Sequence, residues 1–163
     1  MYMKRWIGIL LLLCALLSFA ACANTSQPIE DEEEEIKEPL NLSTLLTREQ
    51  VEEATGIAVG EAEAVTDGSA AYFSADGAQA VYISSMEMST EKFDEMRETL
   101  SASAAVIDAP NLAEKAFWYE EQYVLTVYEN GRALEIRVEY APANANTALL
   151  ASRQLAVLLL EKL

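Results

Sequence analysis

The feature that most constrains the fold is the alternation of apolar and polar side chains on both sides of Asn130-Gly131. This dipeptide is a preferred two-residue type I′ turn, so we expect residues 123–140 to form an antiparallel β-hairpin. One face of the hairpin then carries three apolar cross-strand pairs, which are Tyr123 with Val138, Leu125 with Ile136 and Val127 with Leu134. The other face carries most of the polar side chains, Thr126 among them. The apolar face requires a cover.

A C-terminal helix can supply that cover. Residues 148–163 are rich in leucine, and their polar side chains form two groups about two turns apart, on one side of a helix. Asn144 or Asn146 can cap this helix. We expect its broad apolar arc to pack on the sheet; the alternative is that the arc reaches into a partner.

Two further helices are predicted from their start signals. Thr47 and Gln50 form a capping box, and Gly56 is a natural terminator for a short helix. Ser89 can cap a second helix that runs to about residue 103, with Phe93 at the start of its apolar face.

The other segments predict strands. Three of them are β-prone, at residues 57–65, 70–74 and 79–84. The last two flank Asp76-Gly77, which predicts a tight hairpin. Val106-Ile107 is a short apolar run, and we expect residues 111–117 to form a connection or a helical turn.

The expected order of elements is α-β-β-β-α-β-β-β-α. Because hairpins pair antiparallel, the fold class is α+β, with an antiparallel sheet of about five to six strands packed against helices. This single domain is expected to occupy residues 40–163, a length that suits one hydrophobic core.

The first 22 residues have the layout of a secretory signal peptide. Lys4 and Arg5 form a basic start, residues 7–17 are almost entirely apolar, and Ala20-Ala21 precedes Cys22. The alternatives are an uncleaved membrane helix, an ordinary cleaved signal and a buried core helix. The membrane helix is disfavoured because residues 7–21 fall short of the roughly 20 apolar residues that a span needs.

The end of this segment, Leu16-Leu17-Ser18-Phe19-Ala20-Ala21-Cys22, resembles the lipobox of bacterial lipoproteins. Phe19 departs from the pattern, since that position is more often aliphatic in the family. The resemblance implies that the Cys22 thiol is acylated with a diacylglycerol and becomes the first mature residue. The chain would then be lipid-anchored on the extracytoplasmic face of the cell membrane. Cys14 would leave with the signal, so no disulfide is expected.

Residues 23–39 predict an acidic, disordered tether. Six consecutive acids run from Glu30 to Glu35, with Pro28 and Pro39 near the ends of the segment. Runs of like charge repel and stay extended. A calcium-binding or partner-binding role is the alternative. The segment lacks the alternating oxygen ligands and central glycine of a calcium loop, so we favour a spacer.

The composition excludes several classes of chemistry. The chain has no histidine, and removal of the signal leaves Cys22 as its one cysteine. Ser-His-Asp and Cys-His catalysis and zinc sites built on these ligands are therefore excluded. The mature chain keeps nine basic and 27 acidic residues, a net charge of −18, which repels nucleic acid and anionic headgroups. We expect no enzyme activity, no metal and no cofactor.

Two groups of side chains remain as candidates for function. Trp118 and Tyr119, together with Phe117 and Tyr123, could form an aromatic platform for a ligand or partner; the alternative is that these rings fill the core and cover the sheet edge. Three carboxylates could in principle support acid–base chemistry, and these are Asp67, Asp76 and Asp108. The first two occupy turn positions that aspartate favours for local reasons, so we assign them no catalytic role.

Two segments of the body carry a second resemblance. Residues 111–118, Asn-Leu-Ala-Glu-Lys-Ala-Phe-Trp, and residues 152–163 resemble small actinobacterial lipoprotein and sensor domains of unknown function with a PsbP/Mog1-like fold. Asn111 and Ala113 stand where that pattern has glycines. The resemblance implies an α/β/α-like sandwich without catalytic residues.

These observations together predict a lipid-anchored binding or accessory domain. Its partners would be the membrane, reached through the lipid, and an unidentified protein or envelope component. The alternative is a carrier that holds an apolar small molecule between sheet and helix, with Trp118 at its mouth.

Overall fold

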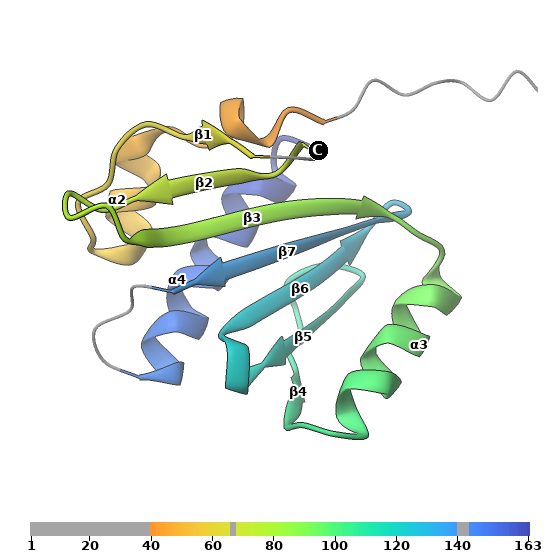
Figure 1. Ribbon diagram of the computed structural model, residues 1–163. Coiled ribbons are helices and arrows are strands. Elements are labelled where there is room, and N and C mark those ends of the chain that lie inside the picture. Colours follow the sequence, from red (N-terminus) through yellow and green to blue (C-terminus); the bar gives the residue numbers. More distant parts are fainter. Residues whose placement is uncertain (1–39, 66–67, 140–143) are drawn as a thin grey trace, which may run out of the picture. The chain divides into compact units, whose positions relative to one another are not determined.

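A computed structural model of the chain describes residues 40–65, 68–139 and 144–163, and these residues form one seven-stranded antiparallel sheet with helices on both faces (Figure 1). The spatial order of the strands is β1-β2-β3-β7-β6-β5-β4. The strands are β1 (Glu63–Ala64), β2 (Ala70–Phe73), β3 (Gln79–Glu87), β4 (Val106–Asp108), β5 (Lys115–Tyr119), β6 (Val124–Glu129) and β7 (Arg132–Val138). The helices are η1 (Leu42–Thr44), α2 (Arg48–Thr55), α3 (Thr90–Ser101), η3 (Glu120–Gln122) and α4 (Ala145–Leu160). The predicted α+β class with an antiparallel sheet is confirmed.

The hairpin at Asn130-Gly131 has the predicted register. Leu125 pairs with Ile136 and Val127 with Leu134, and the turn residues have φ values of 50° and 79°, both positive as a type I′ turn requires. One expected pair is wrong. Tyr123 has a left-handed backbone (φ 53°), so β6 begins one residue later and Tyr123 does not face Val138.

The three predicted α-helices are present, with their caps. Thr47 and Gln50 form both hydrogen bonds of the capping box, and α2 ends at Gly56, which has φ 70°. The Ser89 side chain accepts from the Lys92 amide at the start of α3. Between the two candidates for the cap of α4, the structure selects Asn144, which accepts from the Thr147 amide.

One strand was missed in the sequence. Residues 111–117 were expected to be a connection or a helical turn, but β5 begins at Lys115 and lies between β4 and β6. Both of its faces are covered, so its central residues Phe117 and Trp118 are consecutive and buried. A strand buried on both faces shows no alternation, which is the signal on which the prediction depended. Conversely, the expected strand at 57–65 reduces to β1 and a single bridge between Val59 and Ser74.

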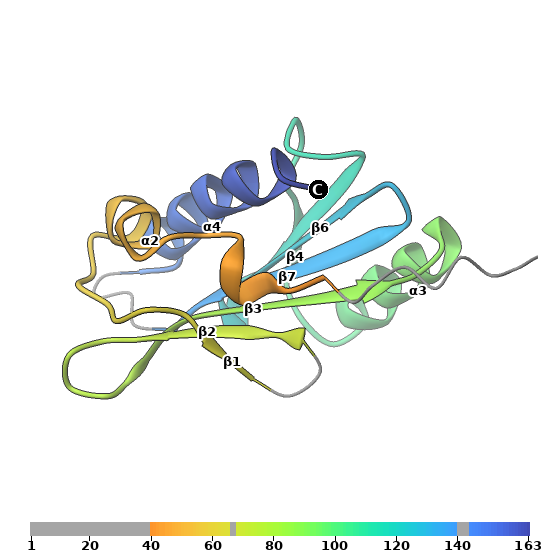
Figure 2. The same ribbon diagram turned by 90° about the horizontal axis from the view of Figure 1, so that it is seen from above.

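The larger core lies between the sheet and the pair α2 and α4, which contact each other on one face (Figure 2). Leu125 and Ile136 from the hairpin meet Leu155 and Leu159 of α4 there, and all four side chains are fully buried. The C-terminal helix therefore covers the apolar face of the hairpin, as predicted.

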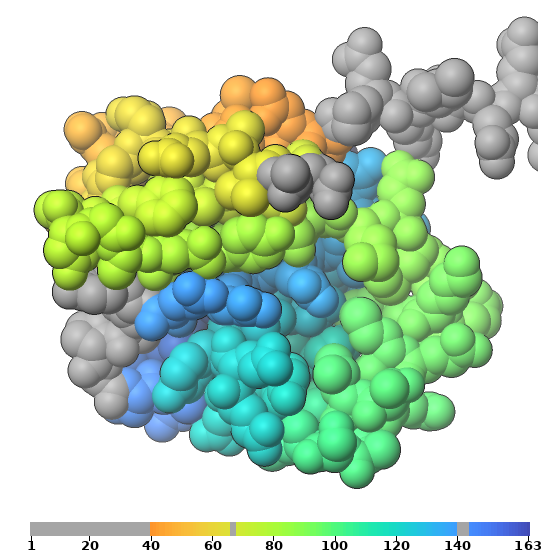
Figure 3. Space-filling model, viewed as in Figure 1, coloured from red at the N-terminus to blue at the C-terminus, as the bar shows by residue number. Residues whose placement is uncertain are grey.

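A smaller core on the opposite face corrects the expectation of a polar surface there. Phe93 of α3 packs against Phe117 and Tyr128, with ring centroids 5.3 and 5.2 Å apart. On the same face, Thr126 pairs with Phe117 in the neighbouring strand and is only 1% exposed. Figure 3, seen from this side, shows that α3 covers one end of the face and leaves β3 and β7 at the surface.

Several predicted features lie outside the described residues. These are the signal segment with Cys22, the tether at 23–39, Asp67 and the end of the hairpin at Tyr140. Within the described ranges, no helix combines the length and the apolar character that crossing a bilayer requires.

Candidate functional site

A cleft of about 630 Å³ lies between α3 and the segment that connects β4 to β5. Helix α3 contributes Phe93, Asp94 and Arg97 to its lining, and the remainder comes from the segment between Asp108 and Ala116. Its volume falls within the range of about 300–1,000 Å³ that is typical of small-ligand sites. We take it as the candidate functional site.

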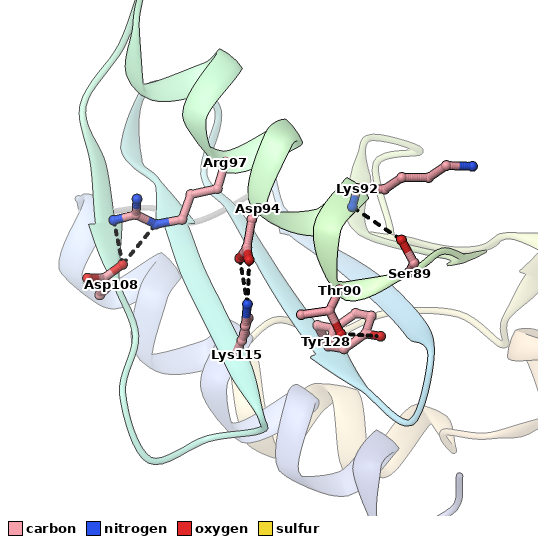
Figure 4. A network of polar contacts seen from close by, with 8 residues as sticks. All are labelled: Ser89, Thr90, Lys92, Asp94, Arg97, Asp108, Lys115 and Tyr128. Carbon is pink, nitrogen blue, oxygen red and sulfur yellow. Dashed lines mark hydrogen bonds and ion pairs between the residues drawn. The ribbon is translucent and has the colours of Figure 1, made fainter.

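Helix α3 is held over the sheet at its first turn. The Thr90 hydroxyl donates to the Tyr128 hydroxyl at 3.0 Å, next to the buried ring of Phe93 (Figure 4). Hydrogen bonds from its own backbone N–H and from the Ser89 hydroxyl lower the pKa of Glu91 in this turn. Asp94 and Arg97 follow Phe93 by one and four residues, so all three lie on neighbouring parts of the helix surface. When the Phe93 ring packs on the sheet, both charged side chains therefore face the cleft.

Two ion pairs join α3 to the sheet across the cleft (Figure 4). Arg97 donates from Nε and Nη2 to the same oxygen, Oδ1 of Asp108, at 3.0 and 2.6 Å. Lys115 Nζ donates to both oxygens of Asp94, at 2.7 and 2.6 Å. The Arg97 and Lys115 side chains are 35% and 37% exposed, so water reaches both pairs.

The wall of the cleft opposite α3 is fixed at both ends. At one end, the Ala109 amide donates to the Ala116 carbonyl and continues the β4–β5 ladder. At the other, the Glu114 carboxylate accepts from the Asn130 amide at 3.1 Å. Asn111 has φ 62° and reverses the chain between these two points, in a conformation that asparagine tolerates well.

This arrangement favours binding of a charged ligand. Each cleft aspartate accepts from a cation instead of facing a second carboxylate as an acid–base pair would. In the Arg97–Asp108 pair, the Nη1 donors of Arg97 and the Oδ2 oxygen of Asp108 take part in neither hydrogen bond. Among the described residues, the pair therefore keeps donors on Arg97 and an acceptor on Asp108 that its own hydrogen bonds do not use.

The predicted aromatic platform does not form. Trp118 is 2% exposed and belongs to the core on the α4 side, where its ring lies 6.3 Å from that of Tyr123. Tyr119 is half-buried and points to the opposite face of the sheet, since successive strand residues alternate. Phe117 lies under α3. The alternative interpretation, in which these rings mainly fill the core, agrees with the structure.

Of the three candidate carboxylates, the two that the structure describes, Asp76 and Asp108, are not brought together. Asp76 lies in the β2–β3 turn, where the Ser74 hydroxyl donates to it, and Asp108 ends β4 at the far edge of the sheet. Asp67 is outside the described residues. Within the described ranges, no group of three or more Asp, Glu, His or Cys side chains is arranged to hold a metal ion.

A second, apolar recess of about 330 Å³ separates α2 from α4 on the outer surface. Ala54, Val157 and Leu158 line it together with three polar side chains. It lies on the surface of the helix pair. The alternative function, a carrier, would instead place its cavity between sheet and helix with Trp118 at the mouth.

Sequence reasoning missed most of the cleft. Asp108 was considered, but as one of three carboxylates for acid–base chemistry, and Asp94, Arg97 and Lys115 were not singled out. The signal that could have found two of them is local: Asp94 and Arg97 follow Phe93 on a predicted helix, on the side that must face the sheet.

Comparison of the sequence with models of known protein families gives no match, and no curated protein matches it.

Proposed function

We propose that this chain is a lipid-anchored, extracytoplasmic, non-enzymatic domain that binds a protein or an envelope component at the α3 cleft. The anchor is supported by the lipobox-like segment that ends at Cys22. One acyl chain gives only marginal membrane binding, whereas two give stable attachment, since each buried CH₂ contributes about 0.8 kcal/mol. A diacylglycerol on Cys22 would therefore hold the protein at the membrane surface.

The observation that carries the binding role is the Arg97–Asp108 pair at the mouth of the cleft, with its unused donors and acceptor. Elsewhere the surface is dominated by acids: apart from Lys4, Arg5 and Lys37, the chain has only eight basic side chains. Two of these, Arg97 and Lys115, line the one cleft together with the carboxylates of Asp94, Asp108 and Glu114. A few charged side chains that converge in a concave site are typical of recognition.

The anchor is tested with Cys22→Ser in the full chain. We expect the variant to take up no labelled fatty acid and to leave the membrane fraction, because serine cannot form the thioether. The measurement is metabolic labelling followed by fractionation. Cys14→Ser is the matched control and should label normally; unchanged labelling of Cys22→Ser would refute the anchor.

The binding role is tested in membranes with the full chain. We expect chemical cross-linking to join the protein to a partner and Arg97→Glu to abolish the product, because the new carboxylate faces Asp108 and removes the donors. Arg48→Glu is the matched control, since Arg48 forms a similarly exposed pair with Glu49 on α2, outside the cleft. Equal yields from Arg97→Glu and wild type would exclude the cleft as the binding site.

A further inference from the structure

From the charges of the cleft we infer that its ligand is a short peptide that carries both a free ammonium and a free carboxylate. This inference rests on the proposed function, because it names the chemical class that the same cleft would accept. The probe for it is a peptide of about three residues, which suits a cleft of about 630 Å³.

Charges of both signs line the cleft. Asp94 pairs with Lys115 and Arg97 with Asp108, in two pairs that water reaches, and the third lining carboxylate, Glu114, accepts from the Asn130 amide. A purely anionic ligand would be repelled by both aspartates, and a purely cationic ligand by Arg97 and Lys115. A molecule with one charge of each sign can place each charge against its opposite.

The Arg97–Asp108 pair has hydrogen-bonding groups that suit both charges of such a peptide. Arg97 keeps both Nη1 hydrogens and one Nη2 hydrogen, and one from each nitrogen can form the parallel pair of hydrogen bonds by which guanidinium binds carboxylates most strongly. Asp108 keeps its Oδ2 oxygen for an ammonium. The ligand can bind to the pair without breaking it, so no charge has to lose its existing partner.

The apolar part of the lining suits the body of a peptide. Phe93, Ala109 and Ala116 contribute a ring edge and two methyl groups between the charged pairs. These groups leave room for small side chains, and they provide no further charges that would favour a highly charged ligand.

The probe is trialanine, measured by isothermal titration or NMR shifts against the purified full chain in detergent. We expect saturable binding, and a loss of about tenfold or more for each of two blocked peptides, N-acetyl-trialanine and trialanine amide. The first lacks the ammonium and the second lacks the carboxylate, while length and side chains are unchanged.

Two variants show which side chain binds which charge of the peptide. Arg97→Gln should weaken the binding of trialanine by about tenfold but leave the binding of trialanine amide unchanged, since that peptide has no carboxylate to lose. Asp108→Asn should weaken the binding of trialanine and leave the binding of N-acetyl-trialanine unchanged, since that peptide has no ammonium. Thermal unfolding verifies that both variants fold, and Arg48→Gln is the control outside the cleft.

Three outcomes would overturn the inference: no binding of trialanine, equal binding of all three peptides, or equal loss for all three in Arg97→Gln. If trialanine fails while cross-linking in membranes still depends on Arg97, the ligand class is wrong and the proposed function stands. If both experiments fail, the cleft is not the binding site.

Discussion

Tyr72 illustrates how a single buried polar group links this fold to pH. Its side chain is fully buried on the α4 side of the sheet, and its hydroxyl donates to the Leu46 carbonyl at 2.9 Å. Burial, with a smaller effect from Glu61, raises its pKa to about 12. The folded state therefore disfavours the phenolate more strongly than the unfolded chain does, where the pKa is about 10.

Titration of Tyr72 should consequently make the free energy of unfolding depend on pH only above about pH 10. Its contribution is complete below that pH and is lost at about 1.4 kcal/mol per pH unit as the pH rises from 10 toward 12. Denaturant unfolding across this window measures the slope. Tyr72→Phe should show a shallower slope, and the same slope in both proteins would contradict the raised pKa.

Thr126 tests the finding that both faces of the hairpin are covered. A hairpin with one solvated face would tolerate aspartate there, but Thr126 is 1% exposed beside Phe117 of the neighbouring strand. We expect Thr126→Asp and Leu125→Asp each to lower the free energy of unfolding by several kcal/mol, because both place an unpaired charge in a core.

The control for this pair is Met86→Asp, the same new side chain on β3 at a position that is 57% exposed. It should change stability by less than about 1 kcal/mol. Urea denaturation compares the three variants. If Thr126→Asp is tolerated while Leu125→Asp is not, the Thr126 face of the hairpin is not covered.

At the scale of elements, α3 depends on few contacts. Its first turn is fixed by Phe93, which touches Phe117 and Tyr128, and two solvent-exposed ion pairs add little, since such pairs contribute about 0–1 kcal/mol each. The aromatic cluster is therefore the main attachment of the helix.

Phe93→Ala should thus release α3 while the main core persists. The substitution removes a buried ring, at a cost of about 3–5 kcal/mol. We expect amide hydrogen exchange of residues 90–101 to accelerate far more than that of α4 (Ala145–Leu160). Uniform acceleration in both helices would show instead that α3 and the main core unfold together.

Elements with local signals could be predicted from the sequence, and those fixed by distant contacts could not. The capping box at Thr47 and the turn at Asn130-Gly131 each specify their own geometry. The strand at Lys115–Tyr119 has no such signal, because its consecutive apolar residues reflect two different helices on its two faces. The burial of Thr126 likewise arises only when the sheet is assembled.

The candidate site was less predictable than the fold for the same reason. Lys115 meets Asp94 across 21 positions of the chain, a pairing that neither helical nor strand periodicity encodes. Trp118, which stood out in the sequence by its size, is buried in the core instead.

At the scale of the whole molecule, the pairing of β3 with β7 differs from every other strand pairing in the described residues. All the others join neighbours along the chain, whereas this one joins residues as far apart as Val81 and Val138. Local hairpins can form early on either side, but this long-range junction has to close a loop, which slows folding. Until it closes, the edges of β3 and β7 that it will join are open to pairing with other chains, so the protein is most prone to aggregate during this interval.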